Sequence, residues 1–385
     1  MKILYISNSR IPTEKAYGIQ IMKMCEAFSV QNNDVELILP TRKSKIFKNI
    51  DAFEFYSVKQ NFKIIKLKCF DPNFLITSIQ GIYIKFQILF FIYNLKKYLK
   101  KNKNKNLILY TRDEYILPIL QKFSKKVVWE AHTLPKNKRH YLKYWGKCFR
   151  IITISQGLKN ELVKLGLNEN KILVASDGVD LEKFKNINHP QPFLEKEGRQ
   201  RLNLPADKKI ILYAGHLYNW KGVQILADAS KFLDKNILIV FVGGTDFDIK
   251  NFKNKNQDLI KENKILILGY KKPESIPKYL KSADILVLPN SAKNIKSSWT
   301  SPLKLFEYMA SNVPIIASDL VSIKEVLNKN NAIFFKPDDS KDLAEKIKNL
   351  LQNQDLSVKI STQALKDVQN YTWQKRAQKI INFVK

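Results

Sequence analysis

The sequence predicts an α/β fold with two domains, each built on a parallel β-sheet. Short apolar runs of strand type alternate with amphipathic helical patterns along most of the chain. Such runs are typical of parallel sheets that helices cover on both faces. A chain of 385 residues, of which 45% are hydrophobic, is long enough for two cores. A polar stretch with three prolines, residues 180–205, separates two sets of strands.

The strand-type runs follow one another in a regular order. In the first half they occupy residues 2–7, 34–40, 106–113, 127–132 and 150–155, and in the second half residues 210–217, 237–244, 264–270, 284–290, 313–318 and 332–337. The helical patterns between them carry one apolar stripe, as at Ile21, Met24, Cys25 and Phe28 or at Val223, Leu226 and Ala227. We therefore expect a first domain at 1–185, a linker at 186–205, a second domain at 206–365 and a C-terminal helix at 366–385 that returns to the first domain.

The balance of charged residues is strongly basic. Lys and Arg total 66 against 35 Asp and Glu, a formal net charge of +31, which suits an anionic partner. The lysines are scattered over both halves and interleaved with asparagine, whereas a nucleic-acid-binding protein needs basic residues clustered on one face. The charge alone therefore identifies no partner, and nucleic-acid binding is the weakest of the functions considered.

The cysteines and the N-terminal residues bear on the compartment. Cys25, Cys69 and Cys148 lie far apart without CxxC spacing, so neither a disulfide framework nor a zinc site is indicated. A reducing, cytoplasmic setting fits. The first residues, MKILYIS, lack the apolar stretch of a signal peptide and are interpreted as the first core strand.

Residues 74–95 are long enough to span a membrane but contain Gln80, Lys85, Gln87 and Asn94, which favours a partly buried or interfacial helix. A cationic run follows at 96–106. The combination suits an anionic membrane surface, and a solvated helix end explains it equally well. The residues concerned are Phe86, Phe90, Phe91, Tyr93, Lys96, Lys97, Lys100, Lys101, Lys103 and Lys105.

The most informative segment is SWTSPLKLFEYMASNVPIIASD, residues 298–319, which follows a strand and a polar loop. We expect Ser301 to cap a helix whose first residue is Pro302, so that the N–H groups near Leu303 and Lys304 form an anion site. Ligands of open α/β sheets lie beyond the carboxyl ends of the strands, where this helix would begin. Glu307 could then accept hydrogen bonds from the ribose hydroxyls of a nucleotide. A capped surface helix with an incidental Glu is the alternative.

This segment resembles the donor-binding segment of glycosyltransferase family 4, whose members have the GT-B fold. The resemblance continues at KAYGIQI with Tyr17 and Gly18, and in order at VVWEAH, ISQGLKNEL, ASDGVDLEKF, YAGHLYNWKG and YTWQKRAQKI. It implies two Rossmann-like domains that face each other across a cleft, and retaining transfer from a nucleoside diphosphate sugar without a metal. It also implies that Glu307 is the ribose ligand.

The resemblance assigns further residues and shows two departures. The family usually has a Glu eight positions before the ribose ligand, where this chain has Trp299, and an Arg where it has His216. The Lys of the diphosphate clamp is present as Lys221. Trp299 either packs against the sugar or is an ordinary buried Trp.

Three positions complete the predicted site. His132 ends the run VVWEAH and is the expected catalytic residue, beside the donor sugar or supporting the reacting centre. Gly18, in a loop just before a helix, would let the backbone approach the donor; a helix-start glycine is the alternative. Tyr270 falls where the family holds the nucleobase. Asp246 and Asp248 form a DxD, a chance occurrence in a charged chain to which we assign no metal.

The expected function is transfer of a hexose-type sugar from a UDP or GDP sugar to a hydroxyl of a growing, lipid-linked surface glycan. No cofactor is expected, and the enzyme would be cytoplasmic or peripheral on the cytoplasmic face of the inner membrane. The alternatives are a nucleotide-sugar epimerase of the same fold and a degenerate, non-catalytic member. Kinase, dehydrogenase and hydrolase motifs such as GxxxxGK[ST], GxGxxG and GxSxG are absent from the sequence.

Overall fold

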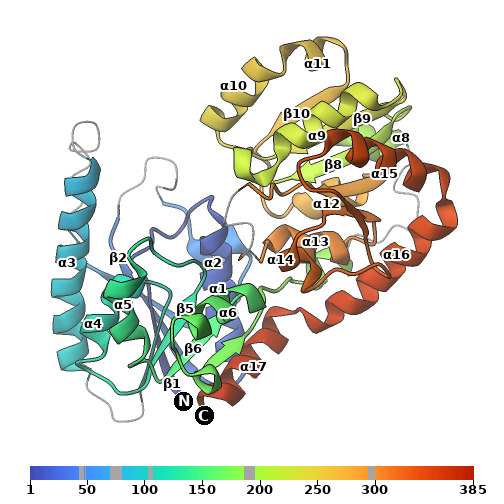
Figure 1. The fold of residues 1–385 in the computed structure, drawn as a ribbon. Helices are drawn as coiled ribbons and strands as arrows, with labels where there is room; N and C mark the ends of the chain where they lie inside the picture. The colour runs from blue at the N-terminus through green and yellow to red at the C-terminus, as the bar shows by residue number, and fades with distance from the viewer. Residues whose placement is uncertain are drawn as a thin grey trace. The chain divides into compact units, whose positions relative to one another are not determined.

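The computed structural model describes the chain except for residues 43–46, 48, 70–79, 103–106, 186–195, 294–298 and 300 and the side chains of 80–84, 196 and 197. The described residues form two compact units (Figure 1). Unit 1 contains residues 1–176 and 373–385, and unit 2 contains residues 177–372. The predicted α/β class with two parallel-sheet domains is confirmed.

Unit 1 contains a seven-stranded parallel sheet of order β3-β2-β1-β4-β5-β6-β7. The pattern search missed β3 and β7, the two edge strands. Two lysines keep β3 from being an apolar run, and β7 has only three residues. The strands are β1 (Lys2–Ile6), β2 (Asp34–Pro40), β3 (Lys63–Leu67), β4 (Leu107–Thr111), β5 (Val127–Ala131), β6 (Arg150–Thr153) and β7 (Ile172–Val174).

The helices of unit 1 include one from the far end of the chain. Helix α17 (Trp373–Val384) packs against α1 (Ala16–Val30), and Arg150 Nε donates to the carbonyl of Phe383 at 2.9 Å. The predicted stripe of α1 is buried, with Met24 and Cys25 fully enclosed. The other helices are α2 (Ala52–Tyr56), α3 (Gln80–Lys101), α4 (Leu117–Leu120), α5 (Lys138–Trp145) and α6 (Gln156–Lys164).

Helix α3 lies on the outside of unit 1 (Figure 1) and is two-faced. Phe91, Leu95 and Leu99 are buried, whereas Phe86, Leu89, Phe90 and Tyr93 are 41–61% exposed. Placing Phe91 on the predicted membrane surface was wrong, because four-residue spacing puts it on the core stripe with Leu95 and Leu99. Lys103 and Lys105 lie outside the described residues. No described helix is both long and apolar enough to cross a membrane.

Unit 2 contains a six-stranded parallel sheet of order β10-β9-β8-β11-β12-β13. Alternate residues of a strand face opposite sides, so Ile210 and Leu212 join one core cluster and Ile211 and Tyr213 join the other. The strands are β8 (Lys209–Ala214), β9 (Ile237–Val242), β10 (Ile265–Gly269), β11 (Ile285–Leu288), β12 (Ile315–Ser318) and β13 (Ile333–Phe335).

The helices of unit 2 cover both faces of this sheet (Figure 1). They are α7 (Glu182–Lys185), α8 (Lys196–Arg201), α9 (Val223–Ala229), α10 (Asp246–Lys255), α11 (Gln257–Lys261), α12 (Ile276–Lys281), α13 (Leu303–Ala310), α14 (Val321–Lys324), α15 (Ser340–Gln352) and α16 (Gln354–Asp367).

The first unit ends at Ser176 and not at residue 185. Val179 and Phe184 are buried in the core of unit 2. Val179 also forms an isolated parallel β-bridge with Thr372, the last residue of unit 2. Of the predicted linker, 186–195 lie outside the described residues. In 196–205, Arg199 is buried and donates to Asp284 at 2.7 Å, which fastens α8 to unit 2.

Candidate functional site

The candidate site in unit 2 lies at the carboxyl edge of its sheet. His216 and Lys221 follow β8, Tyr270 follows β10, and the segment that leads into α13 follows β11. All strands of the sheet are parallel, so these segments leave it at the same edge.

Helix α13 begins at Leu303, one residue later than predicted. Pro302 occupies the N-cap position, and no side chain caps the helix. The predicted Ser301 cap is therefore wrong; its hydroxyl instead accepts a hydrogen bond from the Asp177 N–H at 3.2 Å. Pro302 has no N–H that could bind an anion, and as the N-cap residue it lies just before the first helical turn. The N–H groups of Leu303 and Lys304 remain in the first turn, where the helix supplies no carbonyl partner.

Three predicted charged residues gather beside this helix start. Lys304 Nζ lies 2.7 Å from Glu307 Oε2, one turn apart on α13. Burial lowers the pKa of Lys221 to about 8, and the charge of Lys304 contributes to the shift. Two lysines close enough for the charge of Lys304 to act on Lys221, beside N–H groups at a helix start, favour an anion with more than one negative charge.

The loop after β8 is fixed by close backbone contacts. Gly222 has φ +72°, and a Cβ there would clash with the carbonyl of Pro289. The Ser291 N–H donates to the carbonyl of Trp220 at 3.3 Å. These contacts hold the Lys221 loop against the segment that leads from β11 to α13, which explains why Lys221 senses Lys304.

Aromatic stacking orders the same loop. The ring centroids of His216 and Tyr218 lie 4.9 Å apart at 6°, and those of Tyr218 and Trp220 lie 6.5 Å apart at 22°. Lys221 Nζ lies 4.1 Å from the centroid of Trp220, within cation–π range. Sequence reasoning missed Trp220 in this loop, although its position beside Lys221 in YNWKG was an available signal.

The two aspartates of the DxD sequence lie in the first turn of helix α10. Thr245 and Asp248 form a reciprocal capping box at the N-terminus of α10, and Asp248 Oδ2 lies 3.5 Å from His216 Nδ1. Asp246 stands in the first turn of the same helix. Among the described residues, no group of three or more His, Cys, Asp or Glu side chains is arranged to hold a metal.

The two remaining predicted residues of unit 2 differ in exposure. Tyr270 is 50% exposed directly after β10, and Trp299 is only 7% exposed. An exposed residue at a strand end is accessible to a base, whereas burial of Trp299 is consistent with both interpretations given for it. Their roles stay predictions.

Gly18 lies in unit 1, inside the first turn of α1 and not in a loop before it. Its place in the helix is explained by packing. A Cβ at Gly18 would clash with the hydroxyl of Tyr56 and lie 2.8 Å from Thr13 Cγ2. That hydroxyl accepts from the Thr13 N–H at 2.7 Å and donates to the Thr13 carbonyl at 2.8 Å.

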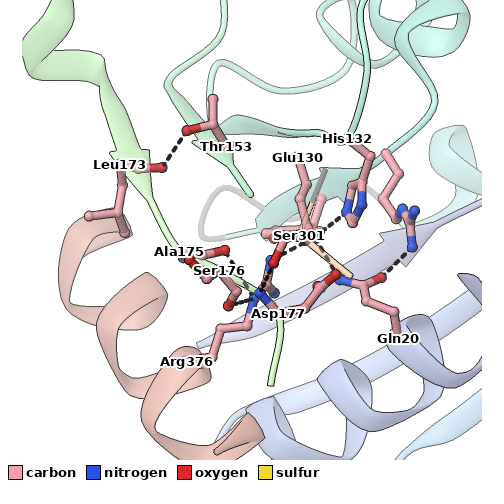
Figure 2. A network of polar contacts seen from close by, with 12 residues as sticks. Gln20, Glu130, His132, Thr153, Leu173, Ala175, Ser176, Asp177, Ser301 and Arg376 are labelled. Carbon is pink, nitrogen blue, oxygen red and sulfur yellow. Dashed lines mark hydrogen bonds and ion pairs between the residues drawn. The ribbon is translucent and has the colours of Figure 1, made fainter. Parts of the chain in front are cut away.

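His132 belongs to a buried polar network at the end of β5 (Figure 2). Its Nε2 lies 2.6 Å from Glu130 Oε1, which also accepts from Gln20 Nε2 at 2.6 Å and from Arg376 at 2.8 Å. The Tyr110 hydroxyl donates to the other carboxylate oxygen. Burial alone would raise the pKa of Glu130, but the charge of Arg376 and the His132 hydrogen bond hold it well below its usual range.

Sequence reasoning found His132 but missed Glu130 and Arg376. Glu130 and His132 are two residues apart on an extended segment and therefore share a face, which was a usable signal. Arg376 is 246 residues away from Glu130, and nothing local indicates that pairing. The network can hold a negative carboxylate and fix one nitrogen of an imidazole.

The chain is similar in sequence to known glycosyltransferases. Residues 195–367 match the model of the family described as glycosyl transferases group 1. The chain is 28% identical over 227 residues to the N,N'-diacetylbacillosaminyl-diphospho-undecaprenol alpha-1,3-N-acetylgalactosaminyltransferase of Campylobacter jejuni, which is 58% of this chain and 56% of that protein. It is 26% identical over 232 residues, 57% of each, to the capsular polysaccharide biosynthesis glycosyltransferase CapM of Staphylococcus aureus. Matches span only 50%, 62% and 56% of the first relatives' lengths.

A solved structure covers nearly the whole chain. The complex of HepE from Anabaena with UDP-glucose aligns with a TM-score of 0.76 at 16% identity, over 99% of this chain and 98% of that one. This likeness establishes the fold across both units.

Proposed function

We propose that this chain, whose residues 195–367 match the model of the group 1 glycosyl transferases and which has the GT-B fold, is a retaining glycosyltransferase. It would move a hexose-type sugar from a UDP or GDP sugar to a hydroxyl of a growing, lipid-linked surface glycan. Relatives named for capsular polysaccharide biosynthesis and for a diphospho-undecaprenol substrate support the acceptor class. A structural neighbour that binds UDP-glucose supports the donor class.

The observation that carries the proposal is the cluster of Lys221, Lys304 and Glu307 beside the start of α13. The donor diphosphate would accept from the N–H groups of Leu303 and Lys304 and pair with both lysines. Glu307 would accept from the ribose hydroxyls. Lys304 and Glu307, which lie 2.7 Å apart, would contact adjacent groups of one nucleotide.

The proposed chemistry exchanges one bond at the anomeric carbon. The bond from C1 to the β-phosphate oxygen breaks, a bond from C1 to the acceptor oxygen forms on the same face, and the acceptor proton passes to the leaving phosphate. Lys221 and the helix start stabilise the charge that develops on this phosphate. His216, with Asp248 beside its Nδ1, would replace the usual Arg. No metal is needed in this scheme.

The acceptor side of the proposal includes an anionic membrane surface on the cytoplasmic face. Phe86, Leu89, Phe90 and Tyr93 are exposed along α3, with spacing that puts them on one face. The exposed cations Lys96, Lys97, Lys100 and Lys101 follow on the same helix. Aromatic residues beside lysines suit an interface with acidic lipids.

Vesicle cosedimentation at low salt tests this surface. We expect binding to vesicles of phosphatidylglycerol and phosphatidylethanolamine, none to phosphatidylcholine, and loss of binding in Phe86→Ser/Phe90→Ser. The matched control is Phe247→Ser, since Phe247 is 74% exposed in unit 2. Equal binding to both vesicle types would remove the membrane from the proposal.

The donor site is tested by calorimetry of wild type and Glu307→Ala with UDP, GDP, ADP and their common sugars, without added metal. We expect one nucleotide to bind selectively and to lose affinity in the variant. Turnover of the selected sugar nucleotide to a free epimer without acceptor would favour the epimerase. No binding of any nucleotide would favour a degenerate member.

A further inference from the structure

Glu130 is a buried carboxylate with four polar partners. Its side chain is fully buried, and both oxygens are used. Oε1 faces Gln20, His132 and Arg376 (Figure 2), and Oε2 accepts from the Tyr110 hydroxyl. Groups from α1, β4 and α17, together with His132 directly after β5, therefore converge on one carboxylate. A pair made only for stability would be replaced at little cost by apolar side chains.

The network fixes the chemistry of His132. An ionised carboxylate only accepts hydrogen bonds, so the His132 Nε2 at 2.6 Å from Glu130 Oε1 must carry the proton. Any proton that this imidazole exchanges with another molecule must then leave or arrive at Nδ1. His132 is 17% exposed at its side chain, whereas Glu130 is 0% exposed, so the histidine is the accessible end of the pair.

Arg376 determines whether Glu130 is ionised and can accept the hydrogen bond from His132 Nε2. Its guanidinium donates to Glu130 Oε1 at 2.8 Å and to the carbonyl of Ser176 at 3.0 Å, and its side chain is 2% exposed. Without a cation, a carboxylate this deep would hold its proton. It would then compete with His132 as a donor. The charged or titratable groups around Glu130 are Tyr5, Cys25, Tyr110, Arg112, His132 and Arg376.

We propose that Glu130 is a positioning residue for His132, and that Arg376 of the C-terminal helix keeps Glu130 able to accept the Nε2 proton. This rests on the proposed function and on the expectation that His132 lies beside the donor sugar or supports the reacting centre. The pair Glu130–Arg376 thereby makes the last helix of the chain part of the transfer reaction, although α17 follows the whole of unit 2 in sequence.

The test uses the full chain with both partners replaced, Glu130→Gln/Arg376→Met, so that no unpaired charge is buried. The control removes another buried pair of unit 1, Lys23→Met/Glu26→Gln, whose atoms lie 3.0 Å apart at 5% and 10% exposure. Thermal melting identifies variants that stay folded. If the double variant unfolds, Glu130→Gln alone is measured in its place.

The first readout is ¹⁵N NMR of the imidazole rings, with the His132 signals assigned from a His132→Asn variant. We expect wild-type His132 to carry its neutral-state proton on Nε2. In the double variant this tautomer should mix with the Nδ1 form, and the titration midpoint should fall because the carboxylate is gone. An unchanged tautomer and midpoint in the folded variant would overturn the proposal.

The second readout is turnover of the sugar nucleotide selected by the binding panel. We expect kcat to fall about 100-fold with little change in KM, and the Lys23→Met/Glu26→Gln control to keep its rate. Unchanged kcat in a variant with altered NMR signals would overturn the positioning role. If wild type turns over no donor while the NMR shift occurs, the proposed function fails and the Glu130–His132 relationship stands.

Discussion

Lys304 Nζ and Glu307 Oε2 lie 2.7 Å apart across one turn of α13, so the expected phosphate ligand and the expected ribose ligand are paired to each other. Both side chains are 25–30% exposed. Such a pair contributes little to stability, and a nucleotide that bridges the two charges can replace it. Substitutions at the start of α13 can therefore test nucleotide binding with little effect on stability.

Lys304→Met should weaken nucleotide binding about tenfold, or about 1.4 kcal/mol. The substitution removes one of the two cations of the proposed diphosphate site. The free energy of unfolding should change by less than about 0.5 kcal/mol, because the pair is partly exposed. Calorimetry with the selected nucleotide measures the affinity. Lys324→Met, from the exposed pair with Asp319, is the control, and equal affinity in the two variants would argue against the site.

Nucleotide affinity should fall as the pH rises from 7 to 9. Burial, with help from Lys304, lowers the pKa of Lys221 to about 8, so its ammonium loses its proton in this window. The diphosphate then meets one cation fewer. Titration calorimetry of wild type and Lys221→Met across these pH values separates this effect from others. A slope retained in the variant would assign the pH dependence to another group.

The same substitution should stabilise the unliganded protein near pH 7. A lysine whose folded-state pKa is lowered opposes folding below about pH 8, where it must be charged in both states. This cost disappears as the pH rises from about 8 towards 10.5, the usual lysine value. Lys221→Met should therefore melt at a higher temperature than wild type at pH 7 and at nearly the same temperature at pH 10. A lower melting temperature at pH 7 would contradict this.

Arg376→Ala should cost about 3–5 kcal/mol of stability, because it leaves the Glu130 carboxylate buried without its cation. Lys379→Ala, on the exposed side of the same helix, should change stability by less than about 0.5 kcal/mol. Urea unfolding followed by circular dichroism measures both. Comparable losses would mean that α17 contributes through helix formation and not through this pair.

Gly18→Ala should destabilise unit 1 by about 1–3 kcal/mol, the range for overpacking. The new methyl group would clash with the Tyr56 hydroxyl, which is held by both backbone groups of Thr13. In a Tyr56→Phe background the added cost should be smaller, since the clashing oxygen is absent. A double-mutant cycle with no coupling would show that the glycine is required for another reason.

Much of the fold could be predicted because it depends on local patterns. Buried strands such as β9 and β11 are apolar at every position, and parallel packing between helices makes that composition necessary. The edge strand β3 escaped detection because its outer positions face solvent and tolerate lysine. Phe91 was predicted on the exposed face of α3 and lies on the buried face. In a helix with aromatic residues on several sides, composition alone does not show which stripe packs against the sheet.

The sequence by itself predicted the fold class, a family resemblance and the candidate segment from Ser301 to Glu307, because periodicity and contiguous motifs are local. Only the tertiary structure decided that Pro302 rather than Ser301 precedes the helix, that Gly18 accommodates Tyr56, and that α17 supplies Arg376 to Glu130. These relationships join residues far apart in the chain. A buried charge or a tightly packed residue needs a partner that is close in space. The local sequence pattern does not identify that partner.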